Sequence, residues 1–170
     1  AVEAILLAEA AKTDDMKLAS MQIILTIFGF ISFGLDGFAH TVEALVGDRL
    51  GKGAFGDAKV VIWRSTLLAF CSAVVISVVL YLCQSTVLTL LTNQRALIET
   101  IGTLWIYVTI LPLVSSLAFQ MDGVFVGATR SDEMRNGMVF ALGSFALGLY
   151  LFPDTGLDAV LAAFIFNLGA

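Results

Sequence analysis

The sequence predicts an all-α integral membrane protein, built as a bundle of transmembrane helices. Hydrophobic residues make up 59% of the 170 residues and charged residues only 14%, and the mean hydropathy is +0.96, which is far from the composition of soluble domains. The charges also leave uncharged runs of spanning length, since a helix needs roughly 20 residues to cross about 30 Å of hydrocarbon. These runs are Leu18–Leu35, Ser65–Gln94, Thr100–Met121 and Asn136–Pro153.

Each uncharged run predicts one complete helix, and the two ends of the sequence predict parts of two more. Residues 1–12 look like the tail of a helix, and the run from Ala159 is still apolar where the sequence stops. We therefore expect the chain to be part of a longer polytopic protein. The complete helices are expected over 17–47, 57–91, 96–130 and 132–152, and the start of a last helix over 156–170.

A glycine-rich stretch between the first two complete helices, LGKGAFGDAKVV at 50–61, has the G-x-G-x-x-G spacing of a nucleotide-binding loop. Such a loop binds phosphate only when a strand precedes it and its backbone N–H groups converge with a lysine. Both flanks here are predicted helices, and MDGVF at 121–125 is not the D-F-G of a kinase. We therefore interpret 47–57 as a turn between two spans.

Lysine and arginine residues are distributed unequally between the two ends of the predicted helices. Six lie after the first and third complete helices: Arg49, Lys52, Lys59, Arg64, Arg130 and Arg135. The opposite ends carry Lys12, Lys17 and Arg95. By the positive-inside rule the first group is cytoplasmic. Trp63 and Arg64 are expected at the membrane interface, with the indole at headgroup level.

Ionisable residues inside the apolar segments are the candidates for function, because a charge at membrane depth costs at least a few kcal/mol and usually faces a cavity or a partner. On the first complete helix, at about 100° per residue, one group of polar and small residues shares an arc of roughly 80°. This group is Gly29, Ser32, Asp36, His40, Glu43 and Gly47.

The third complete helix repeats this pattern, with Ser115, Asp122 and Thr129 at seven-residue spacing. Pro112 lies one turn before them, and a proline inside a helix often kinks it. The candidate functional residues are Asp36, Glu43, Asp122 and His40.

Each candidate also has a structural interpretation: the carboxylates could be structural hydrogen-bonding groups, and His40 could be a packed or capping histidine. Asp36, His40 and Glu43 share a helix face and could hold a metal, but a zinc site commonly uses several His or Cys ligands and the chain has one histidine. Cys71 and Cys83 lie in one predicted helix, so they indicate neither a disulfide framework nor a metal cluster. We expect no cofactor and no nucleic-acid partner.

Two long blocks carry a resemblance to a known family. FISFGLDGFAHTVEALVGDRLGKG at 30–53 and LPLVSSLAFQMDGVFVGATRSDEMRN at 111–136 look like blocks of the C-terminal lobe of MATE (multidrug and toxic compound extrusion) transporters, in the DinF-like branch. The resemblance covers essentially the whole chain. It implies a partial C-terminal six-helix lobe of a twelve-helix, two-lobe transporter: the end of helix 7, helices 8 to 11 and the start of helix 12. The N-terminal lobe would be a partner that this sequence lacks.

The resemblance implies a secondary active efflux antiporter in the cell membrane, which is the inner membrane in a Gram-negative bacterium. Family members export cationic or amphiphilic small molecules in exchange for H⁺ or Na⁺ by alternating access. In DinF-like members an acidic residue of the missing lobe is thought to carry much of the proton coupling. In other branches acidic residues of the C-terminal lobe bind the cation. Asp122 could correspond to one of these C-terminal residues. His40 departs from the aromatic or small residue expected in its block. A flippase for lipid-linked precursors, in the same superfamily, is the alternative; an integral membrane enzyme that uses Asp36, His40 and Glu43 is a third reading.

Overall fold

The computed structural model describes residues 15–130, 132–137, 139, 143, 161 and 163–165. The main helices of this part are α2 (Asp15–Gly51), α3 (Phe55–Leu82), α4 (Gln84–Leu91), α5 (Arg95–Thr103) and α6 (Trp105–Gly127). Residues 132–137 are also helical, and none of the described residues forms a strand. The helix expected over 1–12 lies outside the described residues, as do most residues of those expected over 132–152 and 156–170.

Three of these helices, α2, α3 and α6, are long and apolar enough to cross a membrane. Their 37, 28 and 23 residues correspond to lengths of about 55, 42 and 35 Å at 1.5 Å per residue, compared with about 30 Å of hydrocarbon. They overlap the first three complete helices that the sequence predicts, over 17–47, 57–91 and 96–130. The prediction of an all-α membrane protein is therefore confirmed.

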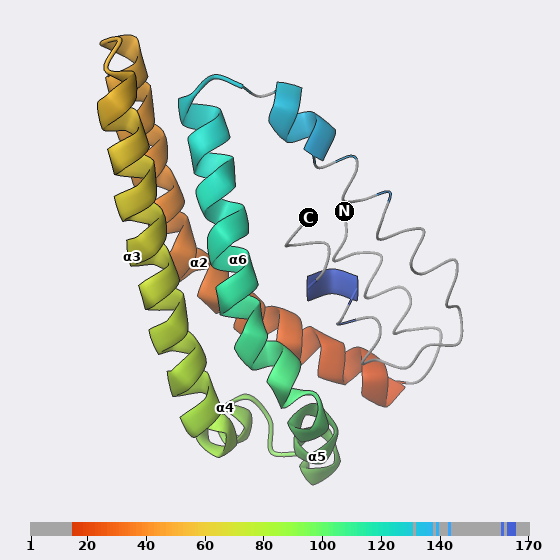
Figure 1. Cartoon of the computed structure of the whole chain (residues 1–170). Helices are drawn as coiled ribbons and strands as arrows, with labels where there is room; N and C mark the ends of the chain where they lie inside the picture. The colour runs from red at the N-terminus through yellow and green to blue at the C-terminus, as the bar shows by residue number, and fades with distance from the viewer. Residues whose placement is uncertain are drawn as a thin grey trace.

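The three long helices pack against one another, with α6 in contact with both α2 and α3 (Figure 1). α2 and α6 run in the same direction and α3 runs in the opposite direction. Figure 1 also shows that α2 bends along its length. Gly29, Gly34 and Gly37 lie in its middle part, and glycine is one of the common sites of helix bending. α6 contains the buried Pro112 and is bent as well.

The glycine-rich stretch is a tight helix–turn–helix connection. α2 continues to Gly51, beyond the end expected at residue 47, and α3 begins at Phe55. Gly53 has a φ of 70°, its N–H bonds to Leu50 O, and the N–H of Ala54 bonds to Arg49 O. These two bonds form the glycine-capped helix end known as a Schellman motif. The N–H groups of Lys52, Gly53 and Ala54 are therefore bonded to carbonyl groups of α2 and are not available to a phosphate.

The ends of α3 and α6 away from this turn differ from the sequence expectation. The structure divides the segment expected over 57–91 at Cys83, and the segment expected over 96–130 at Leu104, into two helices each. At the first break, the buried Trp105 donates its indole N–H to Leu80 O at 3.0 Å. This bond satisfies a carbonyl in the last turn of α3, where intrahelical partners run out.

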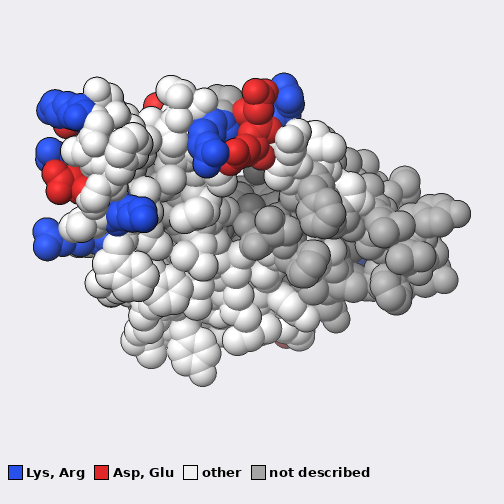
Figure 2. Space-filling model, turned by 45° about the horizontal axis from the view of Figure 1, so that its top comes forward, with Lys and Arg blue, Asp and Glu red and all other residues white. Residues whose placement is uncertain are grey.

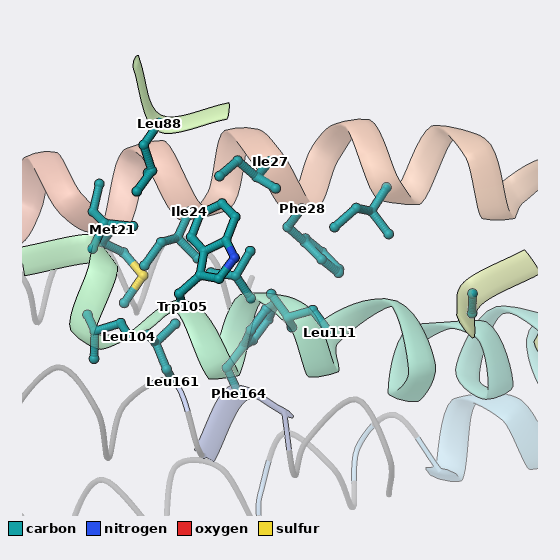
Figure 3. Close-up of a cluster of buried hydrophobic side chains, with 14 of the residues drawn as sticks. Met21, Ile24, Ile27, Phe28, Leu88, Leu104, Trp105, Leu111, Leu161 and Phe164 are labelled. Atoms are coloured by element: carbon teal, nitrogen blue, oxygen red, sulfur yellow. The ribbon is translucent and has the colours of Figure 1, made fainter. Parts of the chain in front are cut away.

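The core lies mainly between α2 and α6, with one residue each from α3, α4 and α5 and two residues near the C-terminus (Figure 3). Met21, Ile24 and Phe28 of α2 face Trp105 and Leu111 of α6. The rings of Phe28 and Phe164 pack edge to face, with centroids 5.3 Å apart. This geometry is one that aromatic pairs prefer.

Charged side chains gather along one edge of the molecule, above a broad uncharged surface (Figure 2). The turn after α2 and the end of α6 lie at the same end of the bundle. This end, called the charged end below, carries Arg49, Lys52 and Arg130, which agrees with the alternation of basic residues in the sequence.

Candidate functional site

A close backbone contact fixes the register of α6 on α2. A Cβ built on Gly127 would lie 2.5 Å from Glu43 O and 3.0 Å from Glu43 Cα. A Cβ on Gly123 would overlap Ala39 O and lie 2.7 Å from Val42 Cγ1. Small residues four apart allow helices in membranes to approach this closely. Glycine at both positions is therefore required by the packing.

This contact brings two of the candidate carboxylates to nearly the same depth. Gly123 lies level with Ala39, and α2 and α6 run in the same direction. Asp36 precedes Ala39 by three residues and Asp122 precedes Gly123 by one, so they lie about 4.5 and 1.5 Å from this level. Their depths thus differ by about 3 Å.

Asp122 also lies on the side of α6 that faces away from α3. At about 100° per residue, Gln120 and Asp122 are turned from Gly123 in opposite senses, by about 60° and 100°. Ser65 of α3 donates a hydrogen bond to Gln120 Oε1 at 3.2 Å. Since Gln120 faces α3, Asp122 is on the other side.

Asp36 likewise lies on the side of α2 that faces away from α3. Gly34 lines an apolar groove of about 370 Å³ together with Ile76 and Leu80 of α3. Asp36 is two residues further along α2, which places it about 160° around the helix from Gly34. The structure therefore brings Asp36 and Asp122 to one side of the α2–α6 pair, opposite α3. We call this side the carboxylate face.

The other two candidate residues on α2, His40 and Glu43, differ in exposure. The side chain of His40 is 80% exposed and that of Glu43 39% exposed, and His40 Nδ1 lies 3.6 Å from Glu43 Oε2. Asp36 and Asp122 are both half-buried. Among the described residues, no group of three or more His, Cys, Asp or Glu side chains could hold a metal ion.

The polar series expected on α6 divides into residues with different roles. Ser115 is buried and donates to Leu111 O at 2.6 Å, which satisfies its hydroxyl within its own helix. Thr129 lies beyond the end of α6 with a φ of 57°, and the N–H of Arg130 bonds to Phe125 O. Thr129 therefore takes the capping position that glycine commonly occupies.

Sequence reasoning missed Gln120, a fully buried polar side chain of α6 near the candidate site. It is 1% exposed, and its Nε2 has no hydrogen-bond partner among the residues that the structure describes. Gln120 precedes Gly123 by three residues and Gly127 by seven, so the three residues share one helix face. This spacing is the feature of the sequence that could have identified Gln120. Gln120 faces α3, so it does not belong to the carboxylate face.

Comparison with known proteins agrees with this architecture. The family model MatE matches residues 2–152. DNA damage-inducible protein F of Escherichia coli strain K12 is 34% identical over 144 residues, which are 84% of this chain and 31% of that relative. The chain thus spans about a third of the length of this relative. No solved structure matches. With a family match over most of its length and apolar helices of spanning length, this chain is a multi-pass membrane protein of the MatE family of transporters.

Proposed function

We propose that the protein containing this chain is a secondary active efflux antiporter. It exports cationic or amphiphilic small molecules in exchange for H⁺ or Na⁺ by alternating access. The observation that supports this most directly is the pairing of Asp36 and Asp122 on one side of the closely packed α2 and α6. Two acidic groups at matching depth in membrane helices are unusual enough to indicate an ion or substrate pathway.

In this proposal Asp36 and Asp122 change charge state during the transport cycle. Burial disfavours the charged form of a carboxyl group, so each acid gains a proton or a Na⁺ when it faces a closed, poorly hydrated cavity. A cationic substrate competes with that ion for the same carboxylates, and this competition couples the two fluxes. Glu43 and His40, 3.6 Å apart, extend the polar surface toward the charged end.

The carboxylate face also supports a proposal for the partner of this chain. The chain forms part of the C-terminal lobe, and the N-terminal lobe of the same protein lies opposite this face and completes the central cavity. Alternating access then consists of one lobe rocking against the other. The protein is located in the cell membrane, which is the inner membrane in a Gram-negative bacterium.

The test is efflux of the cationic dye ethidium from proteoliposomes that contain the intact protein, under an imposed H⁺ or Na⁺ gradient. Asp36→Asn and Asp122→Asn preserve side-chain size and remove the titrating group. Coupling between two ligands is typically about 5- to 150-fold, so gradient-driven efflux should fall at least about 5-fold in each variant. Asp57→Asn is the matched control, because Asp57 is exposed on α3 at the charged end.

The outcomes separate the proposals. Wild-type efflux rates in both Asn variants would show that these acids are structural. If neither gradient drives efflux of the dye by the wild-type protein, antiport of cations is wrong. Movement of a fluorescent lipid-linked precursor across the same vesicles would then favour the flippase.

A further inference from the structure

The surface of α3 that faces away from α2 and α6 is apolar along most of the helix. Only Ala58, Ala69 and Ala73 of its 28 residues are buried. Leu67, Val75 and Leu82 are 52%, 63% and 73% exposed. In a membrane helix, such a surface contacts lipid chains or another apolar surface.

Lys59, Trp63 and Arg64 interrupt this surface near the charged end. All three side chains are exposed, and the indole of Trp63 is 70% exposed. Lys59 and Arg64 are five residues apart, which places them about 7.5 Å apart along the helix axis and about 140° apart around it, with Trp63 at an angle between them. The uncharged run begins directly after Arg64. The two cations therefore lie at the boundary between the charged end and the apolar surface, with an aromatic ring between them.

The pairing of charges distinguishes these two cations from the others at this end. Lys52 Nζ lies 2.6 Å from Asp48 Oδ1, and Arg49 Nε lies 4.0 Å from Asp48 Oδ2. Arg130 and Arg135 pair with acids at 3.1 and 3.2 Å. In the part of the chain that the structure describes, neither Lys59 nor Arg64 has an acidic partner within 4.0 Å, although Asp57 lies nearby in sequence.

We propose that Lys59, Trp63 and Arg64 form a binding site for the headgroup of an anionic phospholipid. The phosphate lies between the ammonium and guanidinium groups, because unpaired cations at a membrane surface attract anionic lipids. The indole lies at headgroup depth, where tryptophan is enriched in membrane proteins. The acyl chains extend along the exposed surface at Leu67 and Val75. This site is independent of the carboxylate face and of the transport reaction.

Native mass spectrometry of the intact protein in detergent, titrated with phosphatidylglycerol or phosphatidylcholine, tests the site. A basic residue near an anionic surface contributes about 5-fold to the binding constant. Lys59→Gln with Arg64→Gln should therefore weaken phosphatidylglycerol binding about 30-fold if the contributions are additive. Binding of phosphatidylcholine should not change. The matched control is Arg130→Gln with Arg135→Gln, which removes two cations that already have acidic partners.

Any of the following results would overturn the proposal. The first is equal binding of the two lipids by the wild-type protein. The second is an unchanged preference for phosphatidylglycerol in the Lys59 and Arg64 double variant, or an equal loss in the control variant. The third is equally tight binding of free glycerol phosphate, because this result would show that the acyl chains and the apolar surface of α3 contribute nothing.

Discussion

Replacement of Gly127 by alanine tests the contact on which the carboxylate face depends. The three atoms nearest to a Cβ at this position are the O, Cα and C atoms of Glu43, at 2.5, 3.0 and 3.1 Å. All three belong to the backbone, so no side-chain rotation can relieve the overlap. The methyl group must be accommodated by moving α6 away from α2.

The size of this movement follows from the distances. Ordinary van der Waals contact begins at about 3.4 Å, so a Cβ 2.5 Å from Glu43 O requires a displacement of about 0.9 Å. Overpacking of this kind typically costs about 1–3 kcal/mol. Alanine regains up to about 1 kcal/mol of helix propensity, less at Gly127 because it is the last residue of α6. We expect a net loss of about 1–2 kcal/mol in the free energy of unfolding.

The assay is unfolding of the intact protein in mixed micelles by titration with sodium dodecyl sulfate. Gly37→Ala is the matched control, because Gly37 lies inside α2 and a Cβ there would meet no heavy atom within 4 Å. This substitution should leave stability unchanged or raise it by up to about 1 kcal/mol.

The reasoning would be refuted if Gly127→Ala were as stable as wild type, or if Gly37→Ala lost as much stability as Gly127→Ala. In the first case the close approach of α6 to α2 would not be needed, and the matched depth of Asp36 and Asp122 would lose its structural basis. In the second case any added methyl group would destabilise the helices, and the contact itself would explain nothing.

Two further predictions concern the core and the topology. Gln120→Leu should maintain or raise the melting temperature of the intact protein, because it removes a buried amide N–H₂ that has no partner among the described residues and whose burial costs about 1–3 kcal/mol. The bond from Ser65 that is lost with it contributes about 0.6 kcal/mol. A lower melting temperature would show that the amide has a partner, such as an ordered water. Ala54→Cys, in the turn between α2 and α3, should not react with a membrane-impermeant maleimide added to intact cells but should react in inside-out vesicles, because the charged end carries most of the lysine and arginine residues. Labelling of intact cells would reverse the predicted orientation.

The sequence alone indicated the three long apolar helices that the structure describes, although not all of their ends, because uncharged runs of spanning length are a strong signal in any chain that enters a bilayer. It also indicated the turn around Gly53, where the left-handed backbone conformation favours glycine. Asp36 and Asp122 could be identified as candidates from the sequence, because charged residues are rare within or next to long apolar segments. The breaks at Cys83 and Leu104 had no comparable signal, and no proline or glycine occupies either position.

Only the tertiary structure decided which helix faces make contact and which residues share a side of the bundle. The long helices are apolar on nearly all sides, so hydrophobic periodicity does not distinguish a face that contacts lipid from one that contacts another helix. In a bilayer this choice depends on close packing of small residues, and Gly123 and Gly127 could have packed on any neighbour. Their contact with Ala39 and Glu43 places Asp36 nearly level with Asp122, and His40 remains exposed. These relations could be found only from atomic distances between segments that are far apart in the sequence.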